Sequence, residues 1–456
     1  TNDSDASSYI CEKTLWTFRQ AVIEMGIDSE IFELITDGLV KEFLVDTGNQ
    51  RLDSVHIRSN MKNLGRIGLF TATIRKFLLN LKRHHCDLFK GLRSGLIETY
   101  HGKDAVAVFS RIKPSESRSN LKQVSEDMFE IYKHFSGTQA VEDMKSYKLM
   151  GRVLNEHCTI CSEKPGKKAE ITLKASKNVG GGTLQNPSDP TAGYNAHKGQ
   201  GYEGQVMETY SASNSDNREV DGKDADCKGN KGNLNLITYV AVNPSNCSDA
   251  DALIPAIKDT EVRGLGPDQL LADALYGSDE NLKSAEEEGV EVIAPIMGYK
   301  EKHAVKLSDF EISEGYKEII CPMGHKAERI KLCKDSLHAG FAIEICSECG
   351  RLSDCPVQKG ARFYYLRRAY QAFKNSHRRK FEDSTEFKEC YRMRSGIEGA
   401  ISELDRRTGI KYLRFRGLSA VRFCMNLKAA GLNIFRSAAF LRLQKPETWK
   451  YRVKKA

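Results

Sequence analysis

The chain has 456 residues, 40% of them hydrophobic, which is enough for a large core and for more than one folding unit. No run approaches the roughly 18 consecutive apolar residues that cross a bilayer, and no signal-peptide pattern opens the chain. We therefore expect a cytoplasmic protein without a membrane partner. Thirteen cysteines, an odd number spread over a long chain, argue against a secreted disulfide scaffold.

The charge is modestly positive, and its placement is more informative than its size. The 69 Lys and Arg residues outnumber the 61 Asp and Glu residues, for a net charge of +8. Basic clusters late in the chain suit a polyanionic partner, although each cluster alone is equally consistent with a solvated surface. They comprise Arg362, Arg367, Arg368, Lys374, Arg378, Arg379 and Lys380, then Arg414, Arg416 and Arg422, then Lys450, Arg452, Lys454 and Lys455.

The first third of the chain is predicted to be mostly helical. Residues 8–48 carry apolar residues at helical spacing. The segment Gln50–Ile57 then predicts a short strand with Asp53 at or near its end. A long helical stretch follows over roughly 60–155, and its apolar stripes indicate helix packing. The stripes are Leu64, Ile67, Phe70, Ile74, Phe77, Leu78 and Leu81, then Leu121, Val124, Met128, Ile131 and Phe135.

Strand patterns dominate the middle of the chain. Glu170–Leu173 predicts one strand, and Tyr202–Met207 and Leu236–Val242 predict two neighbouring strands. The polar segment Ser211–Gly232 predicts an exposed, mobile connection, and Gly180–Gly182 a loop.

A strand–helix–strand alternation follows, which indicates an α/β core. Pro255–Lys258 belongs to a predicted short helix, and Gln269–Asp273 is a buried-strand pattern that ends in a carboxylate. Asp279–Glu288 predicts a helix capped by Ser278, and Val290–Pro295 a further strand. Two more helices are predicted over 386–406 and 417–443.

Two carboxylates stand out by their context. Asp53 and Asp273 each occupy a polar position in an otherwise apolar strand, where a charge is costly unless it is paired or bound to a metal. If their strands are neighbours, the two charges repel and one pKa rises unless a divalent cation neutralises both.

A third carboxylate lies in the predicted helix 386–406. Tyr391, Arg394 and Glu398 are separated by three and four residues and share one helix face. Arg394 can hold Glu398 or reach a phosphate oxygen, and an ordinary surface ion pair is the plainer interpretation. Three carboxylates suit two Mg²⁺ or Mn²⁺ ions roughly 3.5–4 Å apart, which catalyse in-line attack on a phosphodiester without a protein nucleophile.

At these residues the chain resembles the DDE transposases of bacterial insertion sequences, in the branch marked by Tyr-x2-Arg-x3-Glu, and the 1182-type elements look closest. Each matching motif alone is weak, but the four occur in order across most of the chain. They are Arg51–His56 through Asn60, then Pro187–Pro190 through His197–Gly199, Gly201–Tyr202 and Gln205–Val206, then Asp273–Asn281, then Tyr391, Arg394 and Glu398.

The resemblance implies a ribonuclease-H-like α/β fold, a mixed sheet with flanking helices. It implies that Asp53 bridges both metal ions, that Asp273 and Glu398 each complete one, and that Tyr391 and Arg394 support Glu398 or contact DNA. Lys198 is a further candidate for a DNA contact. Water would cut at the end of the element, and the freed 3′-hydroxyl would attack target DNA. The implied partners are double-stranded DNA, both terminal inverted repeats and target, and a second copy of the chain in a homodimer near the bacterial nucleoid.

The chain departs from the family pattern in two places. A basic residue is expected one or two turns after Glu398, but Asp405 stands seven residues on, so the contact is expected to shift to Arg406. The N-terminal helical region also looks incomplete, since family similarity begins near Thr14 and the first residue is Thr1.

A cysteine-rich insertion precedes the last helices. Cys346-x2-Cys349 aims two thiolates at one point, and Cys321, Cys346, Cys349 and Cys355 are the favoured ligands of a structural Zn²⁺. The alternative ligands are His325, Cys333 and His338, and reduced thiols in a loop are the other interpretation. Zinc would explain how an insertion that looks poor in apolar residues stays folded.

The predicted organisation has five parts, which include a long helical insertion and the cysteine-rich insertion. Two other functions remain open beside the active transposase: a DNA-binding remnant without catalysis, and a two-metal DNA nuclease without strand transfer. The parts are an N-terminal DNA-binding or dimerisation region (1–49), a core with a helical insertion (50–300, with 58–160 inserted), the cysteine-rich insertion (301–385), core helices with Glu398 (386–443) and a basic tail (444–456).

Overall fold

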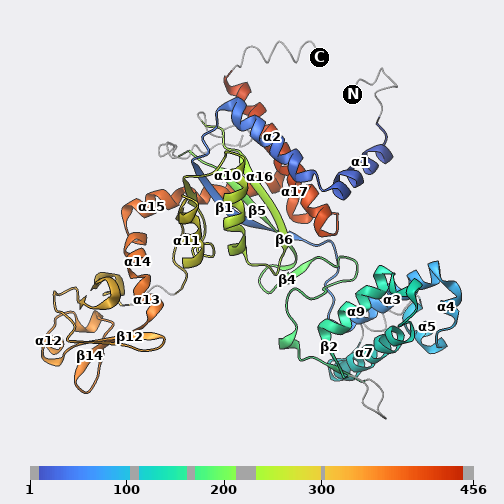
Figure 1. The fold of residues 1–456 in the computed structure, drawn as a ribbon, viewed down its shortest axis with the longest axis horizontal. Helices are drawn as coiled ribbons and strands as arrows, with labels where there is room; N and C mark the ends of the chain where they lie inside the picture. Colours follow the sequence, from blue (N-terminus) through green and yellow to red (C-terminus); the bar gives the residue numbers. More distant parts are fainter. Residues whose placement is uncertain (1–9, 103–111, 162–169, 212–232, 299–302, 445–456) are drawn as a thin grey trace.

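The computed structural model describes residues 10–102, 112–161, 170–211, 233–298 and 303–444, and Figure 1 shows a central body of sheet and helices flanked by two lobes. The predictions for Ser211–Gly232 and for the basic tail fall almost entirely outside the described residues. No helix within these ranges has the length and apolar character needed to cross a membrane.

The central body contains a mixed sheet in which β1 lies in the middle. β5 pairs with β1 antiparallel, β7 pairs with β1 parallel, and β8 pairs with β7 parallel. The other edge of β5 pairs antiparallel with β6 and, at its start, with β4, which confirms the predicted neighbours. The strands are β1 (Asn49–Arg58), β4 (Gly193–Asn195), β5 (Gly199–Thr209), β6 (Ile237–Pro244), β7 (Gln269–Leu271) and β8 (Glu291–Ile293).

The central strand is longer than predicted. Asp53 lies opposite Val206 in the middle of β1, and the ladder continues for five more residues to Arg58. The polar side chains of Ser54 and His56 do not end the strand, because Asp249 and Glu203 accept or share hydrogen bonds with them. The expectation that Asp53 stands near a strand end was therefore wrong.

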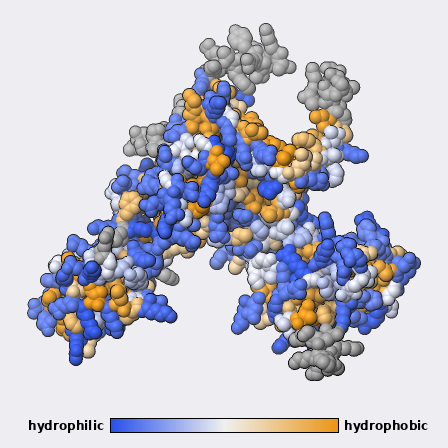
Figure 2. Space-filling view, in the orientation of Figure 1, coloured by the Kyte–Doolittle hydropathy of each residue, from blue (hydrophilic) through white to orange (hydrophobic). Residues whose placement is uncertain are grey.

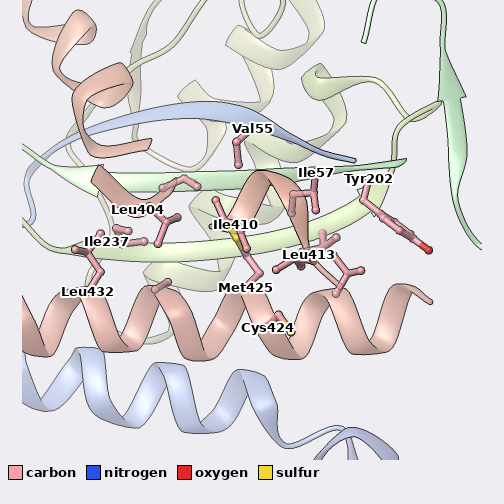
Figure 3. Close-up of a cluster of buried hydrophobic side chains, with 14 of the residues drawn as sticks. Val55, Ile57, Tyr202, Ile237, Leu404, Ile410, Leu413, Cys424, Met425 and Leu432 are labelled. Atoms are coloured by element: carbon pink, nitrogen blue, oxygen red, sulfur yellow. The ribbon is translucent and has the colours of Figure 1, made fainter. Parts of the chain in front are cut away.

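Helices cover both faces of the sheet. On one face Val55 and Ile57 pack against α16 (Gly396–Thr408) and the long α17 (Leu418–Gln444), as Figure 3 shows. Behind α17 lie α2 (Asp28–Phe43) and α1 (Glu12–Met25). On the other face Leu52 packs against α10 (Leu253–Val262) and α11 (Asp279–Glu287). The alternation of Leu52 with Val55 and Ile57 follows from the two-residue period of a strand.

The first lobe is helical and buries the predicted apolar stripes in a core of their own. The strand prediction for Glu170–Leu173 is confirmed as β3, which pairs with β2. The lobe contains α3 (Arg66–His84), α4 (Cys86–Lys90), α5 (Ser94–His101), η2 (Pro114–Glu116), α7 (Ser117–His134), α8 (Gln139–Glu142), α9 (Lys145–His157), β2 (Cys158–Cys161) and β3 (Glu170–Leu173).

The second lobe carries the cysteines and has a real hydrophobic core. Phe310, Leu337, Phe341, Leu366 and Phe373 are all buried in it. The expectation of an insertion poor in apolar residues was wrong, because short strands hide their inward residues among polar neighbours. The lobe contains β9 (Glu311–Ile312), β10 (Ile319–Ile320), β11 (Arg329–Leu332), β12 (Ser336–Ala342), α12 (Ile343–Ser347), β13 (Gln358–Lys359) and β14 (Phe363–Ala369), followed by α13 (Tyr370–Lys374), α14 (Ser376–Glu382) and α15 (Thr385–Arg392).

Candidate active site

Asp53 is presented by the central strand toward the face that α16 covers. Its side chain is 14% exposed. One carboxylate oxygen accepts the backbone N–H of Ser54 at 2.8 Å, and the other accepts Arg394 Nη2 at 2.6 Å. The carboxylate is therefore largely withdrawn from water and depends on one guanidinium for its counter-charge.

Asp273 arrives from the neighbouring parallel strand. β7 ends at Leu271, so Asp273 stands two residues beyond it, in the loop that leads to α11. Its Oδ1 accepts the backbone N–H of Leu275 at 2.8 Å, which shapes the turn. As predicted, Ser278 caps α11 by accepting the backbone N–H of Asn281.

Glu398 comes from the C-terminal helices, whose form differs from the prediction. The single helix expected over 386–406 is broken, because a 3₁₀ turn, η8 (Met393–Ser395), separates α15 from α16. Tyr391 thus lies on α15, Arg394 on the turn and Glu398 on α16. Arg394 still reaches Glu398, with Nη1 at 3.1 Å from Oε1, because the backbone stays right-handed through the turn.

Asp53 is within electrostatic reach of both other carboxylates, Asp273 and Glu398. Burial raises the pKa of Asp53, and the charges of Asp273 and Glu398 raise it further, while Arg394 and the Ser54 N–H partly offset this. Burial also raises the pKa of Tyr391, and the same two aspartates, Asp273 and Asp53, add to the effect. The charges of Asp273, on a loop, and of Glu398, on a helix, thus both act on Asp53 in the strand.

The oxygen donors suit a hard divalent cation, but the arrangement is closed by an arginine. Among the described residues no group of three or more His, Cys, Asp or Glu side chains is arranged to hold a metal ion. At the carboxylates the guanidinium of Arg394 binds Asp53 and Glu398 together. Its charge stands where a cation would otherwise neutralise them.

A buried ionic network holds the helix turn against the sheet. Arg51, one side-chain position before Asp53 on the same face of β1, donates to Glu208 Oε2 from Nε and Nη2, and to the carbonyl of Met393 from Nη1 at 2.9 Å. Arg436 on α17 donates to Glu208 Oε1 at 2.6 Å and to Glu403. Sequence reasoning missed this network, because charges that pair only across the fold look like surface charges in the chain.

Gly396 is the second missed element. A Cβ on Gly396 would lie 1.9 Å from Arg51 Nη1, so a larger residue here would require the Arg51 guanidinium to leave its present position. A glycine two residues before Glu398 was the available signal.

A second polar network on the other face of β1 joins the Asp53 and Asp273 segments. Ser54 donates to Asp249 Oδ2 at 2.9 Å, Gln205 donates to Asp249 Oδ1 at 3.0 Å, and Tyr276 donates to Gln205 Oε1 at 2.6 Å. Asp249 was not singled out in the sequence. The network links the residue after Asp53 to the third residue after Asp273.

The two remaining basic candidates lie in different settings. Lys198 Nζ binds Glu203 at 3.0 Å and Asp249 at 3.1 Å. Burial acts to lower the pKa of Lys198, but hydrogen bonds and charge from these two carboxylates outweigh it and raise the pKa. Lys198 is thus tied into the polar network, while Arg406 is exposed on α16.

The four favoured cysteines lie around one small cavity of about 30 Å³ in the second lobe, and all four have free thiols. The backbone N–H of His325 lies 3.4 Å from Cys321 Sγ, and the turn is closed by hydrogen bonds from Gly324 N to Cys321 O and from Cys321 N to His325 O. Burial raises the pKa of Cys346 to about 11, with Cys355, Cys321 and Cys349 adding to the rise. The thiols are neighbours, but they are not drawn together into a finished metal site. Zinc binding stays a prediction.

Comparison with known proteins places this geometry in context. A family model described as a transposase DDE domain matches residues 320–438. The match supports a DDE-type transposase. It includes most of the cysteine-bearing lobe together with Tyr391, Arg394 and Glu398 of the candidate site, whereas Asp53 and Asp273 lie outside the matched residues.

The other comparisons add no function. The ATP synthase subunit delta of Sulfurihydrogenibium sp. (strain YO3AOP1) is 26% identical over 161 residues, which are 35% of this chain and 86% of that protein. An identity this low over a third of the chain assigns no family. No solved structure matches the chain.

Proposed function

We propose that the chain is a DNA transposase whose catalytic groups are Asp53, Asp273 and Glu398, built on a ribonuclease-H-like core of the 1182-type branch. Two observations support the proposal: Arg394 pairs with both Asp53 on β1 and Glu398 on α16, and the charges of Glu398 and of Asp273, in the loop after β7, act on Asp53. The mixed sheet with helices on both faces and the transposase match support it.

The proposed reaction consists of two displacements at phosphorus. A water oxygen attacks the phosphate at the end of the element, the P–O3′ bond breaks, and the 3′ oxygen leaves and takes up a proton. The freed 3′-hydroxyl then attacks a phosphate of target DNA, so one phosphodiester bond forms as one breaks. Two Mg²⁺ or Mn²⁺ ions would activate the attacking oxygen and stabilise the leaving oxygen.

The residues present would divide the work around these displacements. Asp53 would be shared between both ions, with Asp273 and Glu398 each completing one. Arg394 would release the carboxylates as cations bind and then turn its guanidinium to a phosphate oxygen of the DNA. Tyr391, close to both aspartates, would help to orient it.

A plasmid-nicking assay tests the proposal. Supercoiled plasmid is incubated with the full chain and Mg²⁺ or Mn²⁺, and Asp53→Asn is expected to lose at least about 10³-fold in rate, since two-metal sites supply several kcal/mol of transition-state stabilisation. Asp143→Asn, an exposed aspartate of the helical lobe, is the matched control and keeps the activity. Equal nicking by Asp53→Asn and the control contradicts the proposal.

The same assay separates the two alternative functions. A DNA-binding remnant binds plasmid without any metal-dependent nick. A nuclease nicks, but it does not join a labelled 3′-hydroxyl end to target DNA in a strand-transfer assay. The transposase proposal requires nicking and joining, with both lost in Asp53→Asn.

A further inference from the structure

A basic groove of about 640 Å³ lies where β1 leaves the sheet. One wall is the segment 58–62, which follows the end of β1, and the other is the segment 412–416, which follows η9 (Ile410–Tyr412). Its lining holds four cations and no acidic residue. The cations are Arg58, Lys62, Arg414 and Arg416.

These cations are available to a ligand. All four are exposed, and within the described ranges none of them forms an ion pair. Arg58 lies over the ring of Tyr412, 5.4 Å from its centroid, and Tyr412 itself is 66% exposed. Four unpaired cations in one groove repel one another, so binding a polyanion that neutralises them lowers the electrostatic free energy of the groove.

The two walls are held in place from below. Asp189 is fully buried, and it accepts hydrogen bonds from Ser59 Oγ on one wall at 2.6 Å and from the backbone N–H of Gly417 beside the other at 3.0 Å. Tyr202 donates a third hydrogen bond to it at 2.5 Å. Arg416 Nε joins the walls directly by donating to the carbonyl of Asn60 at 3.0 Å. The groove is thus a built feature and not a chance meeting of loops.

The groove has a defined relation to the candidate active site. Arg58 stands five residues beyond Asp53 on the same strand, which is about 17 Å at 3.3–3.4 Å per residue.

We propose that this groove binds the phosphate backbone of the DNA duplex on which the carboxylates act. The inference rests on the proposed function for the identity of the polyanion. Contacts of this kind position the duplex without reading its sequence, so the groove would serve any DNA that enters the site.

A salt titration of DNA binding tests the groove. The full chain, with a chelator present to prevent cleavage, is titrated into a fluorescent duplex of random sequence at roughly 50 to 200 mM salt. The triple variant Arg58→Gln, Lys62→Gln, Arg414→Gln is expected to lower the slope of log affinity against log salt by up to about 2.7, or about 0.9 for each lost phosphate contact. Arg416 is spared because it also joins the walls.

The matched control removes the same charge elsewhere. Lys145→Gln, Lys148→Gln and Lys177→Gln change three exposed lysines, two on α9 and one on η3 (Ser176–Asn178) just after the helical lobe, and should leave the slope unchanged. Circular dichroism and thermal melting establish that both variants fold. Equal salt slopes for the two triple variants would overturn the proposal that the groove binds the DNA backbone.

The two proposals can fail separately. If the wild-type chain never nicks DNA but the groove variant shows the smaller salt slope, the proposed function fails and the proposal that the groove binds DNA stands. If the chain nicks and both triple variants bind DNA alike, the groove fails and the proposed function stands.

Discussion

The carboxylate site and the cysteine cluster both offer metal ligands, but they are built in opposite ways. Asp53 sits on the central strand, and the turn that bears Arg394 is fixed to that strand by the Arg51 and Glu208 ion pair. Three of the four cysteines lie in turns or loops and Cys346 lies on the short helix α12, and Cys321 Sγ receives one backbone N–H. Figure 1 shows the two regions in separate bodies.

The difference indicates what a metal does in each region. At the carboxylates the polypeptide positions the ligands, and Arg394 supplies a positive charge in the meantime. A cation bound there would add chemistry to side chains that the fold already holds in place. At the cysteines no disulfide joins the turns, so a bound zinc would itself be the cross-link.

The sharpest way to break this comparison is to remove the frame. Arg51 and Glu208 are both buried, so Arg51→Ala leaves a buried carboxylate short of a partner and should lower the free energy of unfolding by about 3–5 kcal/mol. Arg93→Ala removes one partner of an exposed pair with Glu130 and should cost no more than about 1 kcal/mol. Chemical denaturation measures both free energies of unfolding. Similar losses in the two variants would show that Arg51 does not hold the turn against the strand.

Metal removal tests the cysteine half of the comparison. The purified chain is expected to carry one zinc, and at free zinc 100 times the Kd the metal should add about 2.7 kcal/mol to unfolding of that lobe. Cys349→Ser should lose the zinc and the stabilisation, while Cys86→Ser, at an exposed thiol of the helical lobe, should keep both. Mass spectrometry measures the zinc content of each variant. A wild-type chain without zinc that is no more stable than Cys349→Ser would refute a zinc cross-link.

Gly396 tests how closely the frame must fit. In Gly396→Ala the added methyl would overlap the Arg51 guanidinium, which should cost about 1–3 kcal/mol and move the α16 start, with Glu398, away from β1. Nicking should fall more than stability predicts. Gly399→Ala has open space at its Cβ and is the control. Unchanged nicking by Gly396→Ala would mean that the activity does not depend on how closely Glu398 is held to β1.

The smallest expected effect concerns pH. Burial and neighbouring carboxylates raise the pKa of Asp53 above its ordinary value of 3.8. The unfolded chain therefore releases this proton at lower pH than the folded chain, and folded stability falls as pH rises through the Asp53 pKa. Without divalent cations Asp53→Asn, which cannot ionise, should melt above wild type at neutral pH, and the gap should close in acid. A pH-independent gap would contradict the assigned pKa direction.

The α/β order of elements could be predicted because apolar periodicity is local in the chain, and motif order led to Arg394 and Glu398, which pair in the fold. The length of β1 could not, since Ser54 and His56 stay in the strand only through distant partners. The break at η8 was also missed. It lies directly before Gly396, whose close approach to Arg51 exists only in the folded chain.

The buried charges were out of reach for a related reason. Arg51, Glu208 and Arg436 are separated by 157 and 228 positions, and nothing near them in the chain marks them as buried. Of the groove cations, only Arg414 and Arg416 belonged to a basic cluster seen in the sequence, because the fold alone brings residues 58–62 beside 412–416.

Manganese binding measured by electron paramagnetic resonance tests the central claim most directly. With DNA bound, the wild-type chain should hold two Mn²⁺ ions close enough to couple magnetically, roughly 3.5–4 Å apart. Asp53→Asn should lose the coupled pair, because its carboxylate is the one shared by both ions. An unchanged coupled signal in Asp53→Asn, or uncoupled Mn²⁺ in the wild type, would contradict a two-metal site at these three carboxylates.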